Sequence, residues 1–493
     1  MPRDTGRDTG RESGREPPRN ANSVRVGLTG ANHSGEAAKL LHTVQERDIR
    51  FVNLEFTDVV GMAKSVTIPV EQLSDALAAG KWFDGSAIES FARVAETDMF
   101  LRPDLSTFAE APWRTALSES DIAGRGRVAR LICDVLMPNG ERFEGDPRAV
   151  LVAALEAATA LGYSYEVSPE LEFFLFREED AEQIPNRPLP HDRGGYFDLS
   201  TDLAADVRRE IASELASMRI DVESSHHEVA AGQHELDFAR ANALHMADAI
   251  VTARYVIKAV AQRHGLWATF LPKPFHGING SGMHTHQQLA RRLDGANAFG
   301  DASEPQYGLS KVARHFIAGQ LAHAQGMCAL VAPLVNSYKR LVPGFEAPVM
   351  VSWGRVNREA LIRVPRTPTG ARRTVPGDVR VELRSPDPSC NPYLAFALML
   401  RAGLDGIQRE LPLGAPVEEG LYTLDEAARL HRGIALLPPT LGDALEALRA
   451  DEVMMDALGP QIAEWFVEAK SKEWDEYRQH VSPWELQRYL PLY

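Results

Sequence analysis

The stretch from Asn279 to His286, which reads NGSGMHTH, combines residue types suited to ligand binding. Residues two apart in a strand share a face, so His284 and His286 would project together if this stretch is extended. The preceding Gly280 and Gly282 let the backbone approach a ligand closely, which favours a loop folded over something small. Two solvated histidines after a glycine-rich turn would give the same pattern, so the interpretation depends on residues elsewhere in the chain.

Two pairs of glutamates provide the carboxylates that a cation site needs. Glu170 and Glu172 share one face of an apolar strand predicted over residues 165–176, where two desolvated negative charges are costly without a compensating cation. An edge strand whose glutamates reach water is the structural alternative. Glu228 and Glu235 lie an odd number of positions apart, so the chain between them must bend if their side chains are to converge.

A third charged face is predicted over residues 378–385, where Arg380, Glu382 and Arg384 alternate with aliphatic residues. Guanidinium groups recognise carboxylates and phosphates, so we expect an anionic substrate there. Oxygen donors with one histidine and no cysteine favour two or more Mg²⁺ or Mn²⁺ ions over zinc. The chain has neither the HExxH helix of zinc proteases nor a Walker phosphate-binding loop, so metals and arginines would have to hold any nucleotide.

Length and composition limit the classes of protein to consider. The chain has 493 residues, 44% of them hydrophobic and 25% charged, which is typical of a globular protein with two or more domains. Its net charge of -15 argues against a nucleic-acid-binding surface. The three cysteines are widely spaced, which indicates neither a disulfide framework nor a zinc site. Neither a membrane-spanning run nor a signal peptide is evident, so we expect a cytoplasmic protein without a membrane partner.

These candidate residues need folded domains to position them. Residues 1–24 repeat an Arg-acid-Thr/Ser-Gly pattern with few apolar side chains, which predicts a disordered tail. A small α+β domain is predicted over residues 46–141, and a large domain over residues 146–493 that opens with Asp146 as N-cap and Pro147 as the first helical residue. The elements predicted in the small domain are strands near residues 50–56 and 66–68, a helix over 70–79 and a last strand over 128–136.

Seven motifs also occur in an order known from one enzyme family. They cover residues 83–88 (FDGSAI), 168–173 (SPELEF), 226–235 (HHEV through Glu235), 273–286 (KP through HTH), 336–348 (NSYKRLVPGFEAP), 357–363 (NR through Arg363) and 382–388 (ELRSPDP). With these motifs the chain resembles the class I glutamine synthetases from about residue 49 to its C-terminus.

The resemblance implies a fold, a reaction and an assembly. The implied fold class is α+β, with a small N-terminal β-grasp domain and a large catalytic domain whose curved antiparallel sheet forms an open barrel. The implied reaction is ATP-dependent ligation of ammonium to L-glutamate through γ-glutamyl phosphate, giving L-glutamine, ADP and phosphate. The implied assembly is a homo-oligomer, a dodecamer with active sites shared between subunits.

The resemblance also assigns expected roles to individual residues. The expected ligands of one metal are Glu172, Glu228 and Glu235, and those of a second metal on the ATP phosphates are Glu170, His284 and Glu382. The expected glutamate contacts are Asn279, Gly280, Arg340, Arg358 and Arg384. The expected ATP contacts are Glu223, His286, Arg358, Arg363 and Arg380, of which Arg358 and Arg363 would neutralise the transferring phosphoryl group. The expected ammonium pocket contains Asp84 from a neighbouring subunit, Tyr196 and Glu346. Asp84, Glu346 and Arg358 are the expected catalytic residues.

Three positions depart from the family pattern. Ala87 and Ser90 stand where Ser and Gly are usual, and Gln288 stands where a Ser is usual. Ala87 removes a hydroxyl near the ammonium pocket, so a glutamate–amine ligase acting on polyamines or ethanolamine is the alternative activity. A non-catalytic, regulator-binding relative is a further hypothesis, but such a protein would be expected to lose metal ligands, and all six are present.

Two residues resemble known points of control. Arg93 matches an arginine that couples bound glutamine to the neighbouring active site in feedback-inhibited members of the family. Tyr422 aligns with a tyrosine that is adenylylated in other members. The simpler alternatives are a solvated or interface arginine and a packed loop aromatic.

Overall fold

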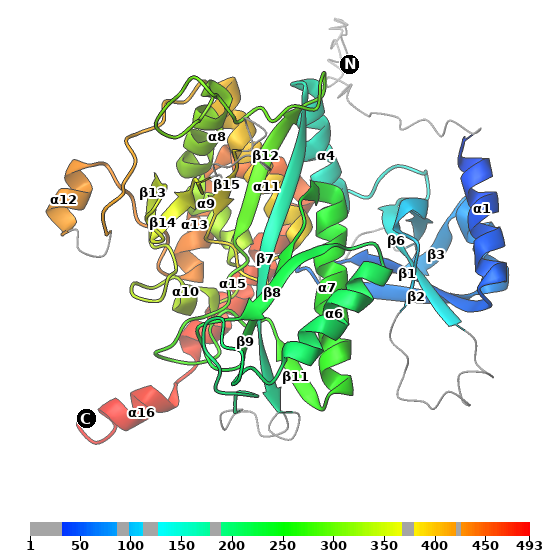
Figure 1. Cartoon of the computed structure of the whole chain (residues 1–493), viewed down its shortest axis with the longest axis horizontal. Coiled ribbons are helices and arrows are strands. Elements are labelled where there is room, and N and C mark those ends of the chain that lie inside the picture. Colours follow the sequence, from blue (N-terminus) through cyan, green and yellow to red (C-terminus); the bar gives the residue numbers. More distant parts are fainter. Residues whose placement is uncertain (1–31, 86–97, 112–126, 178–188, 367–378, 421–424) are drawn as a thin grey trace, which may run out of the picture.

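A computed structural model of the chain describes residues 32–85, 98–111, 127–177, 189–366, 379–420 and 425–493 (Figure 1). The predicted tail over residues 1–24, the departures Ala87 and Ser90, and the predicted regulatory residues Arg93 and Tyr422 lie outside the described residues.

The described residues form helices and strands in an α+β arrangement. The helices are α1 (Asn32–Glu46), α2 (Leu73–Ala79), α4 (Pro147–Ala160), α6 (Ala205–Ser217), α7 (Ala243–Arg263), α8 (Lys311–Ala322), α9 (Ala324–Val331), α10 (Ser337–Arg340), α11 (Pro392–Gln408), α12 (Glu426–His431), α13 (Leu441–Ala450), α14 (Glu452–Leu458), α15 (Pro460–Gln479) and α16 (Pro483–Tyr489), with 3-10 turns η1 (Val70–Gln72) and η4 (Leu105–Thr107). The strands are β1 (Ile49–Thr57), β2 (Ala63–Pro69), β3 (Lys81–Asp84), β4 (Asp98–Pro103), β5 (Ala109–Glu110), β6 (Arg127–Leu136), β7 (Tyr163–Arg177), β8 (Val222–His227), β9 (Gln233–Phe238), β10 (Ala241–Asn242), β11 (Leu266–Thr269), β12 (Thr285–Arg291), β13 (Met350–Gly354), β14 (Ala360–Arg363) and β15 (Val381–Leu383).

The small domain contains a sheet in the order β2-β1-β6-β4-β3, with β5 also paired to β6. Strands β1 and β6 are parallel, and the other pairs are antiparallel. This mixed sheet and its packed helices agree with the expected β-grasp domain. The strands predicted near residues 50–56, 66–68 and 128–136 are confirmed, whereas the helix predicted over 70–79 divides into η1 and α2. Figure 1 shows this domain at one side of the molecule, in blue and cyan.

The large domain is built on a second sheet in the order β13-β14-β15-β12-β7-β9-β8. Its pairs are antiparallel except for β13 and β14, which are parallel. Strand β7 pairs with β12 along its first half and with β9 along its second half, so the sheet changes partners along this one strand. This curved sheet agrees with the open barrel expected for the catalytic domain.

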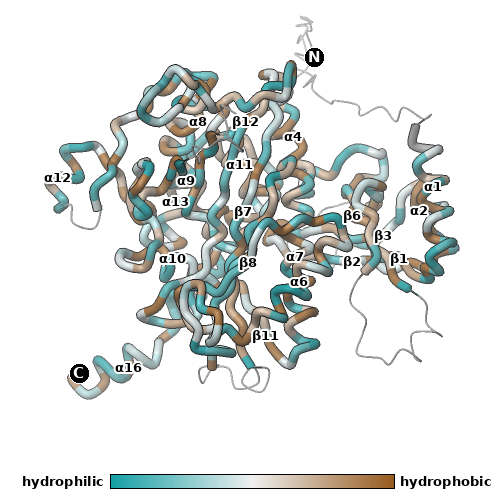
Figure 2. Tube along the Cα trace, in the orientation of Figure 1, coloured by the Kyte–Doolittle hydropathy of each residue, from teal (hydrophilic) through white to brown (hydrophobic). Residues whose placement is uncertain are grey.

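Helices pack behind this sheet and complete the core. Helix α11 contacts α4, α7, α8, α9 and α14, and most of its residues are buried. Helix α4 begins as predicted, because Asp146 Oδ1 accepts a hydrogen bond from Arg148 N at 2.9 Å and Pro147 occupies the first turn. Figure 2 shows hydrophobic and hydrophilic residues interleaved along the helices, as expected when each element buries one face.

A buried cluster of charges joins the two domains. Arg148 on α4 makes ion pairs with Asp104 (2.7 Å) and Asp134 (2.5 Å) of the small domain and with Asp248 (3.1 Å) on α7. Tyr393 on α11 also donates a hydrogen bond to Asp248, at 2.7 Å. One guanidinium therefore holds carboxylates from both domains, which fixes how the domains are oriented.

Two elements at the edge of the molecule make few contacts with it. Figure 1 shows α12 and α16 projecting from the large domain. Near the C-terminus four apolar side chains are largely exposed: Val481, Trp484, Leu490 and Leu492. Among the described residues, no helix is both long enough and apolar enough to cross a membrane.

Candidate active site

Glu170, His284 and Glu382 meet where three neighbouring strands run side by side. Strand β7 carries Glu170, β15 carries Glu382, and His284 directly precedes β12, which lies between the other two strands. One ligand atom from each of these residues lies within 4.8 Å of the others. The structure thus brings together the set expected to hold the ATP-side metal.

Both histidines of the NGSGMHTH stretch contact Glu170. Its Oε1 lies 2.8 Å from His286 Nε2, and its Oε2 lies 3.3 Å from His284 Nδ1. Burial raises the pKa of Glu170, but the hydrogen bonds from His284 and His286 outweigh this effect and hold the pKa well below its usual range. The two histidines therefore share a face as predicted, although β12 itself begins at Thr285.

Glu382 is fully buried and is bound by two guanidinium groups. Its carboxylate accepts hydrogen bonds from Arg363 Nε at 2.5 Å and from Arg384 Nη1 at 2.6 Å. Burial raises the pKa of Glu382, but the positive charge of Arg384 outweighs this and lowers the pKa to about 2. Burial and then Arg384 lower the pKa of His284 to about 4. An ionised carboxylate and a neutral imidazole are the protonation states that metal ligation requires.

Glu228 and Glu235 converge because the chain bends between β8 and β9, as predicted. Glu228 N donates to Gln233 O at 2.8 Å, and Gly232 has a φ of 69°, a left-handed conformation that glycine adopts easily. Across the sheet, Glu235 on β9 lies directly opposite Glu172 on β7. The second predicted set of ligands therefore also comes together.

His226 joins this second set, although the sequence did not predict it. Its Nε2 lies 2.9 Å from Glu228 Oε1 and 3.9 Å from Glu235 Oε2. The neighbouring His227 faces the other way, where its Nε2 lies 2.8 Å from Asp192 Oδ1. The signal in the sequence was the pair of histidines before Glu228, but the pair alone does not tell which of them faces the glutamates.

The carboxylates of the second set repel one another in a buried setting. Burial, with the negative charge of Glu228 as a second cause, raises the pKa of Glu172 to about 8. Burial and then the charge of Glu172 raise the pKa of Glu235 well above its usual range. A divalent cation would relieve both effects, and a donor set rich in oxygen fits Mg²⁺ or Mn²⁺. The residues present therefore fit the expected metals.

The glycines of the NGSGMHTH stretch are required by close packing. A Cβ on Gly280 would lie 2.1 Å from Pro272 O, and a Cβ on Gly282 would lie 2.5 Å from Arg340 Nη2. The amide of Ser281 donates to Pro272 O at 2.8 Å. The loop therefore packs closely against its neighbours. Gln233 Nε2 donates hydrogen bonds to Gly280 O at 3.1 Å and to Glu172 Oε2 at 2.8 Å, and so connects the loop to the second set of ligands.

Two arginines expected to contact glutamate also hold the backbone of the site. Arg340 donates to the carbonyl oxygens of Arg384 at 3.0 Å and Ser385 at 2.9 Å. Arg384 Nη2 donates to Glu346 O at 3.2 Å. Arg384 therefore links Glu382 to the segment that carries Glu346.

Glu346 and Arg358 line one pocket of about 480 Å³, together with Asn357, Glu359 and Glu418. Both Glu346 and Arg358 are exposed, so their charged groups can face a substrate. Glu346 has a φ of 55°, a left-handed conformation that costs a residue other than glycine about 1–3 kcal/mol. The surrounding contacts must therefore hold this residue in place.

Tyr196 lies beside the second set of ligands. Its ring centroid is 5.5 Å from that of His226. Burial and then the negative charge of Glu228 raise the pKa of Tyr196, with further contributions from Glu235 and Glu346. Arg358 opposes this shift, so Tyr196 lies within reach of the charges of both Glu346 and Arg358.

The remaining predicted residues lie in different environments. Asn279 is half-buried in the loop before Gly280, whereas Glu223 on β8 and Arg380 just before β15 are exposed. Gln288 is buried on β12 and donates to Glu166 Oε2 at 2.7 Å. Asp84 ends β3 in the small domain, and Figure 1 shows β3 well away from β7 and β12. A single chain therefore does not bring Asp84 to the metal ligands.

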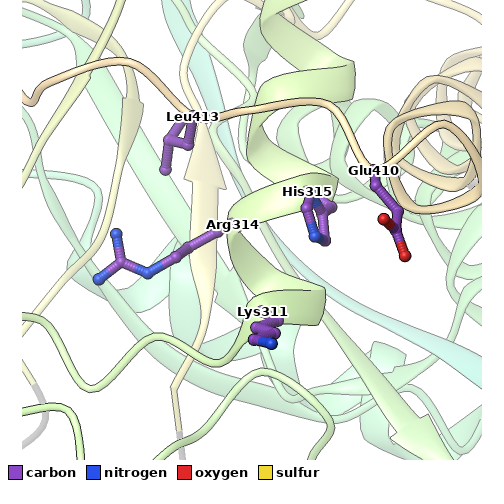
Figure 3. A pocket seen from close by; sticks show the side chains of 5 residues that line it. All are labelled: Lys311, Arg314, His315, Glu410 and Leu413. Atoms are coloured by element: carbon purple, nitrogen blue, oxygen red, sulfur yellow. The ribbon is translucent and has the colours of Figure 1, made fainter.

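A separate hollow lies between α8 and the loop after α11, lined by Lys311, Arg314, His315, Glu410 and Leu413 (Figure 3). It contains none of the predicted site residues. Arg314 forms an ion pair with Glu304 at 3.4 Å, and His315 Nδ1 lies 2.8 Å from Leu411 O. Two of its three basic side chains are thus engaged within the chain.

Comparisons with known proteins match nearly the whole chain. Family models described as the glutamine synthetase β-grasp domain and catalytic domain match residues 48–138 and 144–489. The glutamine synthetase of Thermus thermophilus is 49% identical and covers 92% of this chain and 99% of its own length. That of Halobacterium salinarum is 49% identical and covers 92% of this chain and 96% of its own length. A solved structure described as a GmaS/ADP complex superposes with a TM-score of 0.79 at 31% identity, and covers 92% of this chain and 99% of its own.

Proposed function

The chain belongs to the glutamine synthetase family, and from this premise we propose how its residues carry out the reaction. It is a glutamate–ammonia ligase, which joins ammonium to L-glutamate with ATP to give L-glutamine, ADP and phosphate. The observation that carries the proposed mechanism is the convergence of two partly buried sets of candidate ligands on one sheet. Ligation of polyamines or ethanolamine is not favoured, because the curated relatives are named glutamine synthetases.

We propose two divalent cations, Mg²⁺ or Mn²⁺, in each site. Glu172, Glu228 and Glu235 would hold one of them, and Glu170, His284 and Glu382 would hold the other. When bound, such ions neutralise the negative charge of the phosphates and of the transferring phosphoryl group. Glu382 can take part although it binds two arginines, because a carboxylate offers about four lone-pair positions.

The arginines of the site carry the phosphoryl-transfer step in this proposal. The γ-carboxylate of glutamate attacks the γ-phosphorus of ATP and the bond from that phosphorus to ADP breaks, which gives γ-glutamyl phosphate and ADP. Arg358 and Arg363 stabilise the charge on the transferring group, a contribution that fixed charges make large. Asn279, Gly280, Arg340, Arg358 and Arg384 orient the glutamate, whereas Glu223, His286, Arg358, Arg363 and Arg380 bind the nucleotide.

A pocket of negative charge prepares ammonium for the second step. Tyr196 and Glu346, joined by Asp84 of a neighbouring subunit, would bind NH₄⁺, and the carboxylate of Glu346 or Asp84 would accept one of its protons. The resulting ammonia attacks the γ-carbonyl carbon, the bond from this carbon to the phosphate oxygen breaks, and the extra proton on the attacking nitrogen passes to the departing phosphate. The raised pKa of Tyr196, caused by burial and then by Glu228, supports the negative character of this pocket.

We further propose a homo-oligomer, a dodecamer, with each site shared between subunits. Two observations support an assembly of this kind. Asp84 lies far from the metal ligands of its own chain, and the apolar side chains around α16 are exposed. A cytoplasmic location is also proposed, supported by three free and buried cysteines and by the intracellular substrate ATP.

Arg93 and Tyr422 lie outside the described residues, and for them we propose regulatory roles on the basis of their motifs. If Arg93 couples bound glutamine to a neighbouring site, Arg93→Ala should leave the uninhibited rate nearly unchanged and relieve inhibition by glutamine. Steady-state rates with and without glutamine test this role. Adenylylation of Tyr422 would appear as an added adenylyl mass on a peptide that contains this residue.

The proposed reaction is tested with a panel of amines at fixed ATP and glutamate. Ammonium should give the highest kcat/KM, because an anionic pocket lined by Tyr196 and Glu346 suits a small cation better than a longer amine. Glutamine and phosphate are quantified in parallel, which also detects ATP turnover without ligation. A higher kcat/KM for ethanolamine or a polyamine would contradict ammonium as the substrate, and absence of any product would contradict a ligase.

A further inference from the structure

Lys273 connects two segments of the site that are far apart in sequence. Its side chain is buried, and its Nζ donates a hydrogen bond to Ile278 O, just before the loop expected to hold glutamate. The same Nζ lies 3.8 Å from the centroid of the Phe345 ring. An ammonium over an aromatic face at this distance makes a favourable cation–π contact. One ammonium group therefore bridges Ile278 and Phe345.

The backbone and the stem of Lys273 are also fixed. Asn336 clamps its backbone, because Lys273 N donates to Asn336 Oδ1 at 2.7 Å and Asn336 Nδ2 donates to Lys273 O at 3.1 Å. A Cβ on Gly280 would lie 3.2 Å from Lys273 Cδ, so the lysine stem runs directly beside the glutamate loop. The side chain thus has little freedom to leave this position.

Phe345 belongs to the segment over residues 343–346, which carries Glu346. Pro343, Gly344 and Glu346 are exposed, and Phe345 is half-buried. Glu346 has a positive φ, so its own backbone does not favour this conformation, whereas Gly344 adopts its positive φ easily. Arg384 holds the C-terminal end of the segment through Glu346 O, and Lys273 holds its aromatic ring.

We propose that Lys273 is a positioning residue that holds the segment 343–346 against the glutamate loop, so that the site stays closed while γ-glutamyl phosphate waits for ammonia. This inference rests on the proposed function and adds a residue to it. Among the described residues, Lys273 makes no hydrogen bond or ion pair with the expected metal ligands. It acts through Phe345 on Glu346 and through Ile278 on Gly280.

Loss of this contact should let water compete with ammonia. Water then adds to the γ-carbonyl carbon of γ-glutamyl phosphate, the bond from that carbon to the phosphate oxygen breaks, and the excess proton passes to solvent. Glutamate and phosphate are released, so ATP is consumed without glutamine formation. The ratio of phosphate to glutamine therefore measures how well the site is closed.

The experiment compares Lys273→Met and Phe345→Leu with the wild-type chain. We expect each variant to raise the ratio of phosphate to glutamine, and the KM for ammonium, by a factor of about three to ten, which corresponds to a partly desolvated cation–π contact. The KM for ATP should change by less than about twofold, because neither Lys273 nor Phe345 is among the residues expected to bind ATP. Lys273→Arg should restore most of the coupling, since a guanidinium can also stack on the ring and donate to the carbonyl.

A matched control is available on α7. Lys258 Nζ lies 5.8 Å from the centroid of the Phe270 ring, and Lys258 is exposed. Lys258→Met removes a lysine–phenylalanine pair of the same kind outside the segment 343–346, and it should leave both the product ratio and the KM values unchanged. Phe345→Leu tests the inference even if Lys273→Met does not fold, because Phe345 is only half-buried.

The double variant Lys273→Met/Phe345→Leu completes the test. If the two residues act through one contact, the double variant should raise the product ratio no more than the stronger single variant does. The inference would be overturned if the increase in the double variant equalled the product of the two single increases. It would also be overturned if both single variants had the product ratio and the KM for ammonium of the wild type. Wild-type glutamine formation is measured in the same assay, so failure of the ligase assignment is distinguished from failure of the role of Lys273.

Discussion

At the scale of single residues, Glu382 shows how a residue of a proposed metal site can also neutralise buried positive charges. Its fully buried carboxylate accepts hydrogen bonds from Arg363 and Arg384, and it lies with Glu170 and His284 in the cluster proposed to hold a metal on the ATP phosphates. Removing this carboxylate leaves two guanidiniums without their shared counter-charge. Variants of Glu382 therefore do not report on metal binding alone.

We predict that Glu382→Ala and His284→Ala both abolish turnover. The two variants should differ in their free energy of unfolding. Glu382→Ala should lower the free energy of unfolding by about 3–5 kcal/mol, the cost of leaving a buried charge unpaired. His284→Ala should keep most of the stability and weaken Mn²⁺ binding at least about tenfold, since loss of an outer-shell partner alone costs that much. Urea unfolding and calorimetric Mn²⁺ titration measure the two effects. Equal stability of the two variants would contradict the role of Glu382 as a counter-charge.

A second prediction concerns protons at Glu172. Its pKa of about 8, caused by burial and then by Glu228, means that the metal-free site holds a proton there below pH 8. A metal must displace this proton, so affinity for Mn²⁺ should rise with pH up to about 8, by at most about tenfold per pH unit for each proton released. Calorimetry in buffers of different ionisation enthalpy counts the protons. In Glu172→Gln the count should fall, and an unchanged count would place the proton elsewhere.

At the scale of elements, His323 joins five helices. It lies between α8 and α9, with its Nε2 3.0 Å from Asp405 Oδ2 on α11 and its Nδ1 2.8 Å from Asp451 Oδ2, the residue between α13 and α14. Burial lowers the pKa of His323, but hydrogen bonds with Asp451 and Asp405 outweigh it, so the pKa is raised above 6.5. The charged imidazolium therefore stabilises this helix contact.

The sign of the pH effect follows from the raised pKa. Its stabilisation is fully present below the ordinary histidine pKa of about 6.5 and is lost as pH rises through the higher folded-state pKa. We expect His323→Gln to be less stable than the wild type below pH 6.5, and the difference to shrink at higher pH. Thermal unfolding across pH measures this difference, with His431→Gln on the exposed helix α12 as control. A difference that grows with pH would contradict the charged state.

The sequence predicted the strands that carry the candidate metal ligands, but it did not predict the side-chain contacts between different segments of the site. The alternation around Glu170 and Glu172 indicated β7, and the odd spacing of Glu228 and Glu235 indicated the bend at Gly232. The roles of Lys273 and Asp192 had no such signal. Lys273 reaches Phe345 through space, and Asp192 meets His227 across a loop, so periodicity along one element cannot reveal these pairs.

At the scale of the whole molecule, the orientation of the two domains depends on contacts that no local pattern predicts. Arg148 collects Asp104, Asp134 and Asp248 from separate parts of the chain. Asn391 Nδ2, at the start of α11, donates to Asp58 O of the small domain at 3.1 Å. These contacts hold the small domain, and with it Asp84, in a fixed direction relative to the catalytic sheet.

Shared sites predict that two inactive variants can restore activity together. Asp84→Ala should remove the contribution of a neighbour to the ammonium pocket, and His284→Ala should remove a metal ligand within the chain. After subunit exchange, some interfaces would pair an intact Asp84 with an intact His284, so activity should return to about one quarter of the wild-type value or less for random pairing of equal subunit amounts. Mass spectrometry verifies the exchange, and no recovery in mixed assemblies would contradict shared sites.

The position of the small domain's sheet at the start of the chain has a consequence for folding during synthesis. All described strands of the small domain precede residue 137, so this sheet can form before β7 has emerged from the ribosome, because domains fold as units with the N-terminal one first. The carboxylates of Asp104 and Asp134 remain unpaired with Arg148 until this residue emerges, shortly after the last strand. Asp248 joins the cluster only after about one hundred further residues. The catalytic sheet can be completed only when β15 has emerged and paired with β12. The large domain therefore folds in contact with a small domain that is already folded.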